Sequence, residues 1–135
     1  MSGVTNLSQL LQEMSPLLHS EEYVFCSFPE AKYGDKSELR PVASLIESEG
    51  LSLVVPRNKA DEFDIPYDEV MKMVTLQVHS SLQAVGLTSA FAAKLSEHGI
   101  SANVVAGTFH DHIFVPAAKA DSALAALGEL QDSGF

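Results

Sequence analysis

Three histidines are the residues of this sequence whose types and spacing best suit chemistry. His110 and His112 flank Asp111, and residues two apart on a strand share one face. His79 closes the alternating run that starts at Val74. If the strands carrying them are neighbours, the three imidazoles lie at one end of a sheet. Such a group could bind zinc or transfer protons.

Two interpretations of the His-Asp-His segment remain open. It could supply metal ligands, with His79 as a third nitrogen donor. It could instead form a hairpin turn in which Asp111 accepts backbone N–H bonds. No closed four-ligand set and no nucleophile with a base partner accompany these residues. We therefore expect no resident metal, no cofactor and no catalytic residue.

The segment Ser80–Thr88 joins an expected strand to an expected helix. Backbone amides at a helix N-terminus can bind a carboxylate, and Ser80, Ser81 and Thr88 add hydroxyl groups. Gly86 permits a close approach of a ligand to the backbone. The alternative is that these hydroxyl groups only cap the helix.

The first half of the sequence mixes helical and extended patterns. Apolar residues between Asn6 and Leu18 have helical spacing, although Pro16 disturbs the last turn. Strands are expected at 23–28, 42–47 and 51–55, and a short helix at about 58–63. The polar stretch 29–41 predicts a loop or one helical turn. Cys26, the only cysteine, lies in an apolar run and is interpreted as a buried small residue.

The second half predicts the order β-α-β-β-α. Strands are expected at 74–78, 102–106 and 113–115, with helices at about 87–98 and from Pro116 onward. Gly99 fits the position just after a helix end. This is a ferredoxin-like βαββαβ pattern without its last strand. Because an unpaired edge beside a core is a liability, we expect a strand from the N-terminal half or from another subunit to fill the gap.

Composition limits the classes of function. The 135 residues are 46% hydrophobic and 19% charged, which is typical of a folded globular protein. The net charge of −10, with eight Lys and Arg residues, argues against nucleic acid and anionic membrane surfaces as partners. A single cysteine and an N-terminus without a signal-peptide pattern predict a cytoplasmic protein.

Three sequence blocks together resemble the ACT-domain family, small-molecule regulatory modules found with many enzymes of amino-acid metabolism. The blocks are Glu49–Val54, Val78–Thr88 and His110–Pro116. The resemblance implies an α+β fold of two interlocked ACT-like units with antiparallel sheets, residues 1–68 and 69–135. The tandem arrangement is similar to the regulatory part of aspartate kinases.

The resemblance also implies an amino-acid ligand near the loop between the first strand and first helix of the second unit. Gly86 matches the characteristic turn glycine of the family, whereas Ala84 and Val85 stand where many ACT domains have Asp and Pro. The candidate ligand-binding residues are His79, Ser80, Ser81, Val85, Gly86, Leu87, Thr88, His110 and His112.

The expected function is that of a regulatory or sensor protein without catalytic activity that binds a small molecule and forms a homodimer. One alternative is a metal-binding protein or metal-dependent enzyme centred on the His-Asp-His segment. The other is a protein-interaction module that binds no ligand.

Overall fold

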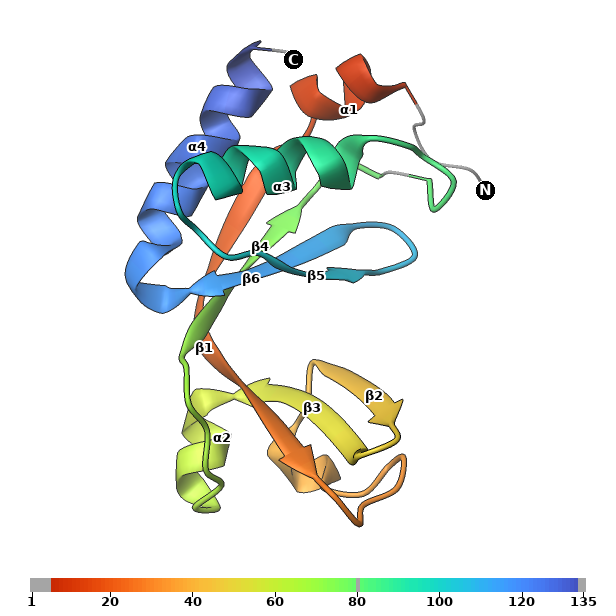
Figure 1. Ribbon diagram of the computed structural model, residues 1–135, viewed down its shortest axis with the longest axis vertical. Helices are drawn as coiled ribbons and strands as arrows, with labels where there is room; N and C mark the ends of the chain where they lie inside the picture. Colours follow the sequence, from red (N-terminus) through yellow and green to blue (C-terminus); the bar gives the residue numbers. More distant parts are fainter. Residues whose placement is uncertain (1–5, 80, 134–135) are drawn as a thin grey trace. The chain divides into compact units, whose positions relative to one another are not determined.

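The computed structural model describes residues 6–79 and 81–133, and it contains two compact units (Figure 1). We call residues 1–19 with 72–135 the terminal unit and residues 20–71 the central unit. The elements are α1 (Leu7–Gln12), β1 (Pro16–Phe28), η1 (Ser37–Leu39), β2 (Ala43–Glu47), β3 (Gly50–Pro56), α2 (Arg57–Glu62), β4 (Met71–Leu76), α3 (Leu87–Glu97), β5 (Asn103–Ala106), β6 (Asp111–Pro116), η2 (Ala117–Lys119) and α4 (Ala120–Ser133). The predicted boundary between two ACT-like units at residue 68 stays a prediction. It divides the chain by repetition in the sequence, whereas the two compact units divide it by packing.

In the sheet of the terminal unit, a strand from the N-terminal half fills the empty position, which is one of the two predicted sources. Its strand order is β1-β4-β6-β5, and β4, α3, β5, β6 and α4 follow one another along the chain. The start of β1 therefore occupies the position of the absent fourth strand of a ferredoxin-like unit. This pairing covers an edge of β4 that would otherwise expose unpaired backbone groups.

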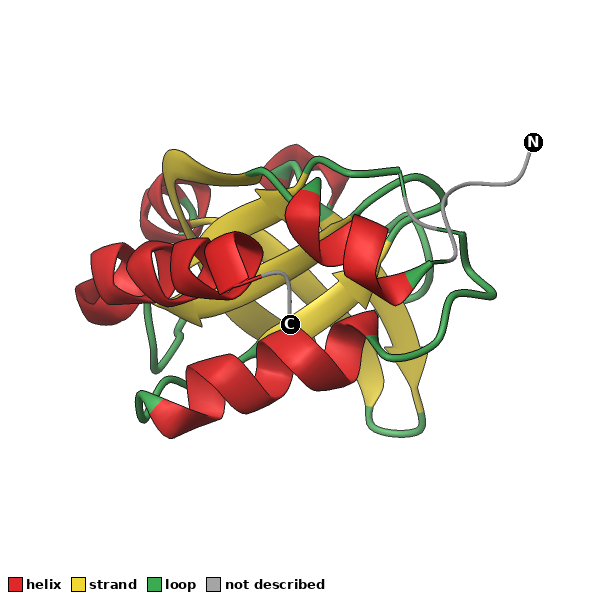
Figure 2. Cartoon of the chain, turned by 90° about the horizontal axis from the view of Figure 1, so that it is seen from above, coloured by secondary structure: helices red, strands yellow, loops and turns green. Residues whose placement is uncertain are grey.

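Three helices cover one face of that sheet. Helices α1, α3 and α4 contact one another and lie over the strands (Figure 2). The face is apolar because alternate residues of β4 and β6 point toward the helices, as do one stripe of α3 and one of α4. The largest fully buried side chains of this core are Leu10, Leu11, Met14, Leu76, Phe91, Leu95, Ile113 and Leu127. Burial of each such side chain contributes about 1.5–3 kcal/mol.

The first helix is shorter than its apolar spacing predicts. Asn6 is its N-cap, and the Asn6 side chain accepts a hydrogen bond from the backbone N–H of Gln9 at 3.0 Å. The helix ends at Gln12, and Ser15 has a left-handed φ of 42° immediately before Pro16. A proline disfavours helical backbone in the residue before it, so the chain turns there and continues as β1. The prediction of a helix to Leu18 was therefore wrong.

Strand β4 also differs from the expected alternating pattern. The predicted strand at 74–78 lies in fact at Met71–Leu76, and Thr75, predicted on a polar face, is buried. The side chains of the two neighbouring strands help to cover Thr75, because its hydroxyl oxygen lies 2.8 Å from Nε2 of His19 on β1 and 2.9 Å from Nδ1 of His112 on β6.

The central unit has the strand order β2-β3-β1. β3 pairs antiparallel with both neighbours; for example, Leu53 lies opposite Cys26 of β1 and Ser44 of β2. Cys26 is buried as predicted, and burial raises the pKa of its thiol. The core of this unit consists of Val24, Cys26, Leu39, Leu51, Leu53, Val55 and Ala60.

The remaining elements lie close to their predicted positions. The stretch 29–41 is a loop with the single 3-10 turn η1, which confirms the prediction of a loop or one helical turn. Gly99 follows α3 with a left-handed φ of 68°, which confirms its place after the helix end. In the part of the chain that the structure describes, no helix is both long and apolar enough to cross a membrane.

Candidate functional site

The connection from β4 to α3 ends at a glycine in a left-handed conformation. Gly86 is the N-cap of α3 with a φ of 100°, and it carries no side chain to cap the first turn. An L residue adopts this φ at a cost of about 1–2 kcal/mol. The backbone amides at the start of this helix therefore lie where a bound anion could replace a capping side chain.

Ser81 stabilises its own turn and does not cap α3. Its hydroxyl oxygen accepts a hydrogen bond from the N–H of Gln83 at 3.1 Å, and its carbonyl oxygen accepts one from Ala84 at 2.9 Å. Thr88 is exposed in the first turn of α3, whereas Leu87 is buried in the core. Ser80, also predicted to bind ligand, lies outside the described residues.

Large apolar side chains are exposed on this connection. Leu82 is 71% exposed and Val85 is 83% exposed. Phe109, in the hairpin between β5 and β6, is 57% exposed. Leu82 and Val85 precede the uncapped N-terminus of α3 along the chain, so this connection offers both apolar surface and backbone hydrogen-bond donors.

Phe109 of the hairpin contacts His79, in the segment that follows β4. Its ring centroid lies 5.0 Å from that of His79 and 6.5 Å from that of His110. His110 Nδ1 is 3.2 Å from the carbonyl oxygen of Val78. Because a carbonyl only accepts, this nitrogen carries the proton in that contact. His79 and His110 are thus brought together, as the strand order predicted, through a phenylalanine that the sequence analysis did not select.

His112 has different partners, one of which the sequence analysis missed. Its Nδ1 lies 2.9 Å from the hydroxyl oxygen of Thr75, and the same oxygen lies 2.8 Å from Nε2 of His19. The network crosses β1, β4 and β6, which are adjacent in the sheet. Thr75 has one hydroxyl hydrogen, so it donates to at most one of the two imidazoles and accepts from the other.

Burial changes the acid–base properties of the His-Asp-His segment. Desolvation lowers the pKa of His112, and the neighbouring His110 and His19 lower it further. Desolvation raises the pKa of Asp111, while His112 and His110 oppose that rise. A neutral imidazole at His112 can act as either donor or acceptor toward Thr75, which suits a structural hydrogen bond.

The structure gives no support to a three-histidine metal centre. His112 is directed to Thr75, while His79 and His110 contact Phe109. Within residues 6–79 and 81–133, no group of three or more His, Cys, Asp and Glu side chains could hold a metal ion. The reason is that the hairpin sends His110 and His112 to different partners.

Helix α1 places the side chain of Leu7 next to Gly86. A Cβ atom built on Gly86 would lie 3.1 Å from Cδ2 of Leu7, which is tighter than an ordinary packing contact. The turn after α1 is also held to the end of β4, because the Gln77 backbone N–H donates to the carbonyl of Met14 at 3.0 Å. The connection from β4 to α3 is thus packed against α1.

The family models that match this chain both describe one family. Two ACT-domain family models match the chain, one over residues 2–72 and the other over residues 70–129. A protein of unknown function from Vibrio cholerae, described as a possible transport protein, is 50% identical in sequence. The alignment covers 96% of this chain and 99% of that protein, with a TM-score of 0.85. A search of the curated proteins finds no match.

More distant structures share the fold. Protein Atu0741 from Agrobacterium tumefaciens is 19% identical, with 86% of this chain and 87% of that chain covered and a TM-score of 0.66. The ligand-free regulatory subunit of aspartate kinase from Thermus thermophilus is 10% identical. That alignment covers 87% of this chain and 97% of the subunit, with a TM-score of 0.64.

Proposed function

The chain belongs to the ACT-domain family, and from that premise we propose that it is a non-catalytic regulatory protein that binds an amino acid. The proposed binding site is the connection from β4 to α3 together with the hairpin that carries His110. One observation carries this choice. Val85, 83% exposed, directly precedes Gly86, the left-handed residue at the start of α3.

The two ends of an amino acid fit different parts of this connection. The α-carboxylate would accept hydrogen bonds from backbone amides at the start of α3, where the helix dipole favours negative charge. The side chain would pack on Val85, Leu82 or Phe109, which are all exposed. Burial of apolar area contributes about 25 cal/mol per Å², so these residues would favour an apolar side chain on the ligand.

His79, His110 and Thr88 would complete the site. In this proposal His110 keeps its contact with Val78 and presents its other ring nitrogen. His112 takes an indirect part, since its contact with Thr75 fixes β6 against β4. The hydroxyl groups of Ser81 and Thr88 would donate further hydrogen bonds to the ligand.

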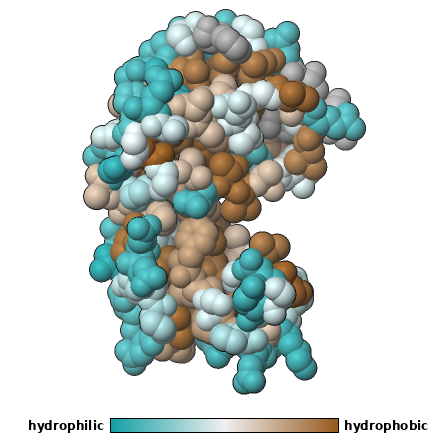
Figure 3. Space-filling model, in the orientation of Figure 1, coloured by the Kyte–Doolittle hydropathy of each residue, from teal (hydrophilic) through white to brown (hydrophobic). Residues whose placement is uncertain are grey.

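We further propose that the protein acts as a cytoplasmic homodimer. Its two outer strands support this assembly, because β2 exposes Leu45 and Ile46 and β5 exposes Val104 and Val105. Figure 3 shows hydrophobic surface over both strands. Edge strands with apolar side chains and unpaired backbone groups favour pairing with a further chain. A ligand would regulate the protein by favouring one assembled state, which requires a higher affinity for that state.

The test is a thermal-shift screen of the full chain against the twenty amino acids. A ligand at a hundredfold excess over its Kd stabilises a one-site protein by about 2.7 kcal/mol, which is readily visible. We expect one or a few amino acids to raise the midpoint. If none does and the protein is a dimer, the ligand-free interaction module becomes the better description.

The site assignment needs a matched pair of variants. Gly86→Ala and Gly99→Ala both place a Cβ at a left-handed φ, but only the first would contact Leu7 and the proposed site. We expect both to lose about 1–2 kcal/mol of stability, and only Gly86→Ala to lose the ligand-induced shift. Equal ligand responses in the two variants would place the ligand elsewhere.

A further inference from the structure

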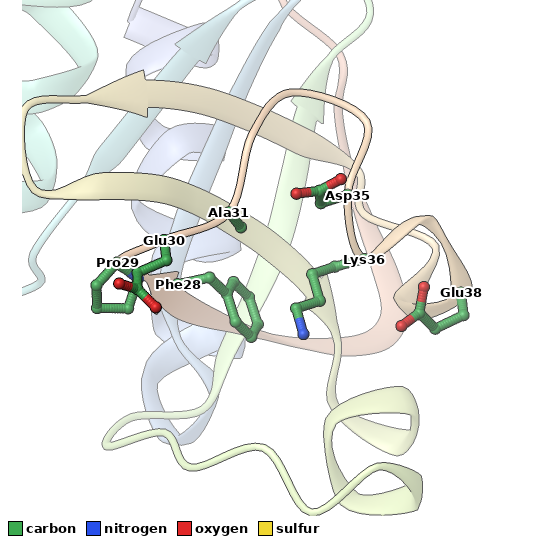
Figure 4. Close-up of a pocket in the computed structure, with 7 residues that line it drawn as sticks. All are labelled: Phe28, Pro29, Glu30, Ala31, Asp35, Lys36 and Glu38. Carbon is green, nitrogen blue, oxygen red and sulfur yellow. The ribbon is translucent and has the colours of Figure 1, made fainter.

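A pocket of about 740 Å³ lies in the central unit, far along the chain from the site proposed above. It is formed by the end of β1 and the loop that leads to β2 (Figure 4). Its lining residues are Phe28, Pro29, Glu30, Ala31, Asp35, Lys36 and Glu38. All seven come from one segment of eleven residues, so the pocket needs no other part of the chain.

The pocket lies in a connection whose equivalent in the terminal unit contains a helix. In the terminal unit the connection from the first to the second strand contains α3, which buries Leu87, Phe91 and Leu95. The same connection in the central unit contains the single turn η1, which buries only Leu39. One turn covers less of a sheet than an eleven-residue helix does.

The apolar floor of the pocket is consequently left incompletely covered. Phe28 and Ala31 pack against the core of the central unit but remain half-buried. Phe28 lies opposite Leu51 of β3, on the face that holds the core. Its side chain therefore packs partly on the core while part of its surface faces the pocket.

The ring of Phe28 already interacts with an ammonium group of the chain. Nζ of Lys36 lies 5.3 Å from the ring centroid, and Figure 4 shows this side chain directed toward the ring. An ammonium group within about 6 Å of an aromatic face is attracted by the negative charge of that face. The pocket thus offers a ring that attracts cations, with an internal cation beside it.

The charged groups that line the pocket are predominantly negative. Glu30, Asp35 and Glu38 contribute carboxylates, against the one ammonium of Lys36. Asp35 accepts a hydrogen bond from the N–H of Lys32 at 2.8 Å, which holds the loop. A metal ion is a poor fit, because no three acidic or histidine side chains of the described residues gather at one coordination point.

We propose that this pocket binds a small organic cation, an aliphatic amine, at a site independent of the amino-acid site proposed above. The ammonium group of the ligand takes the place of Lys36 on the ring of Phe28. The other end of the ligand reaches the carboxylate of Glu30, which lies on the side of the ring away from Glu38 (Figure 4). The methylene groups of the ligand pack on Pro29 and Ala31. The net charge of −10 adds a long-range attraction for cations.

The experiment is a titration of the isotope-labelled full chain, followed by backbone amide NMR spectra. The probes are 1,5-diaminopentane and, at equal ionic strength, the diacid glutarate, which has the same number of carbons. We expect the diamine to shift the amides of residues 28–38 with a saturable curve and glutarate to leave them unchanged. A diamine without effect on these amides, or glutarate binding there, overturns the proposal.

Charge variants separate a specific site from general attraction to an acidic protein. Glu30→Gln with Glu38→Gln removes two lining carboxylates, whereas Asp68→Asn with Glu69→Gln removes two exposed carboxylates of the same unit that do not line the pocket. We expect the double variant at the pocket to weaken diamine binding about two- to fivefold, as the loss of an exposed charge pair does. Equal weakening by the two double variants overturns the proposal.

Lys36→Met tests the competition directly. If the ligand ammonium replaces Lys36 on the ring, this variant binds the diamine at least as tightly as the wild type does. Loss of diamine binding in Lys36→Met contradicts the proposal. Because the same spectra report residues 81–88, an amino acid that shifts only those amides supports the regulatory site without bearing on this pocket.

Discussion

The two units make the same connection in two different ways. In the terminal unit the chain passes from β4 to β5 through α3, which begins at Gly86 and buries three apolar side chains. In the central unit it passes from β1 to β2 through a loop whose single turn buries Leu39. The helix closes its sheet face, whereas the loop leaves a pocket. One topology therefore gives two kinds of candidate ligand site.

Local sequence explains the difference between the connections. The stretch 87–97 has apolar residues at helical spacing and contains neither Gly nor Pro. The stretch 29–41 begins and ends with proline and contains Gly34. Proline fixes φ and lacks an N–H, so a long helix does not form there.

The largest expected effect comes from removing the anchor of each connection. Phe91 is fully buried under α3, so Phe91→Ala should lower the free energy of unfolding by about 3–5 kcal/mol. Leu39→Ala should cost about 2–3 kcal/mol, because the exposed loop around Leu39 can relax into the space. Urea denaturation measures both. A greater loss for Leu39→Ala would mean that the loop is the more tightly packed connection.

A glycine substitution tests how the loop of the central unit is held. A Cβ on Gly50 would lie 2.5 Å from the carbonyl oxygen of Phe28 and 2.6 Å from Cα of Pro29, where the loop begins. We expect Gly50→Ala to destabilise the protein by about 2–3 kcal/mol. Gly34→Ala is the control, since it shares a left-handed φ but meets no atom within 4 Å. It should cost only about 1 kcal/mol in thermal or urea unfolding.

The buried polar network distinguishes the sheet of the terminal unit. Thr75 is the one buried polar side chain found among the described residues, and its hydroxyl bridges His19 and His112. Thr75→Val keeps the shape but removes the bridge, at an expected cost of about 1–2 kcal/mol. Thr75→Ser, which keeps the hydroxyl, should preserve the imidazole signals of both histidines in NMR spectra. If both variants leave these signals unchanged, the bridge is absent in solution.

The smallest expected effect is a pH dependence from His112. Its pKa in the folded protein is below the ordinary value of about 6.5, so the unfolded chain binds the proton first as the pH falls. The contribution is complete above about pH 6.5 and is lost as the pH falls through the lower folded pKa. His112→Asn should flatten this part of the stability profile between pH 7 and 5. A wild-type slope in His112→Asn would contradict this role of His112.

Much of the fold could be predicted because it depends on local patterns. The order β-α-β-β-α, the helix end before Gly99 and the loop at 29–41 all follow from apolar spacing and from Gly and Pro. The same order left one sheet position empty, and β1 occupies it. The helix predicted to Leu18 ends at Gln12 instead, because Pro16 disfavours helical backbone before it although the apolar spacing continues.

The candidate site could be predicted only in part. Strand order brought His79 and His110 together, but the ring between them, Phe109, has no sequence signal beyond its place in a hairpin. His19 was missed because it falls just after the segment assigned to the first helix. An extended interpretation of 16–28 would have placed it on a strand, although not next to Thr75.

The sequence by itself determined the order of the elements, because this order depends on neighbours within a few positions. It also indicated the family, through three short blocks found together in one order. Only the tertiary structure decided that Thr75 is buried between two histidines and that a hollow forms beside Phe28. Both follow from which strands are adjacent and from how much of a face a connection covers. Those are long-range properties. The sequence around a side chain does not indicate which residue of a distant strand will pack beside it.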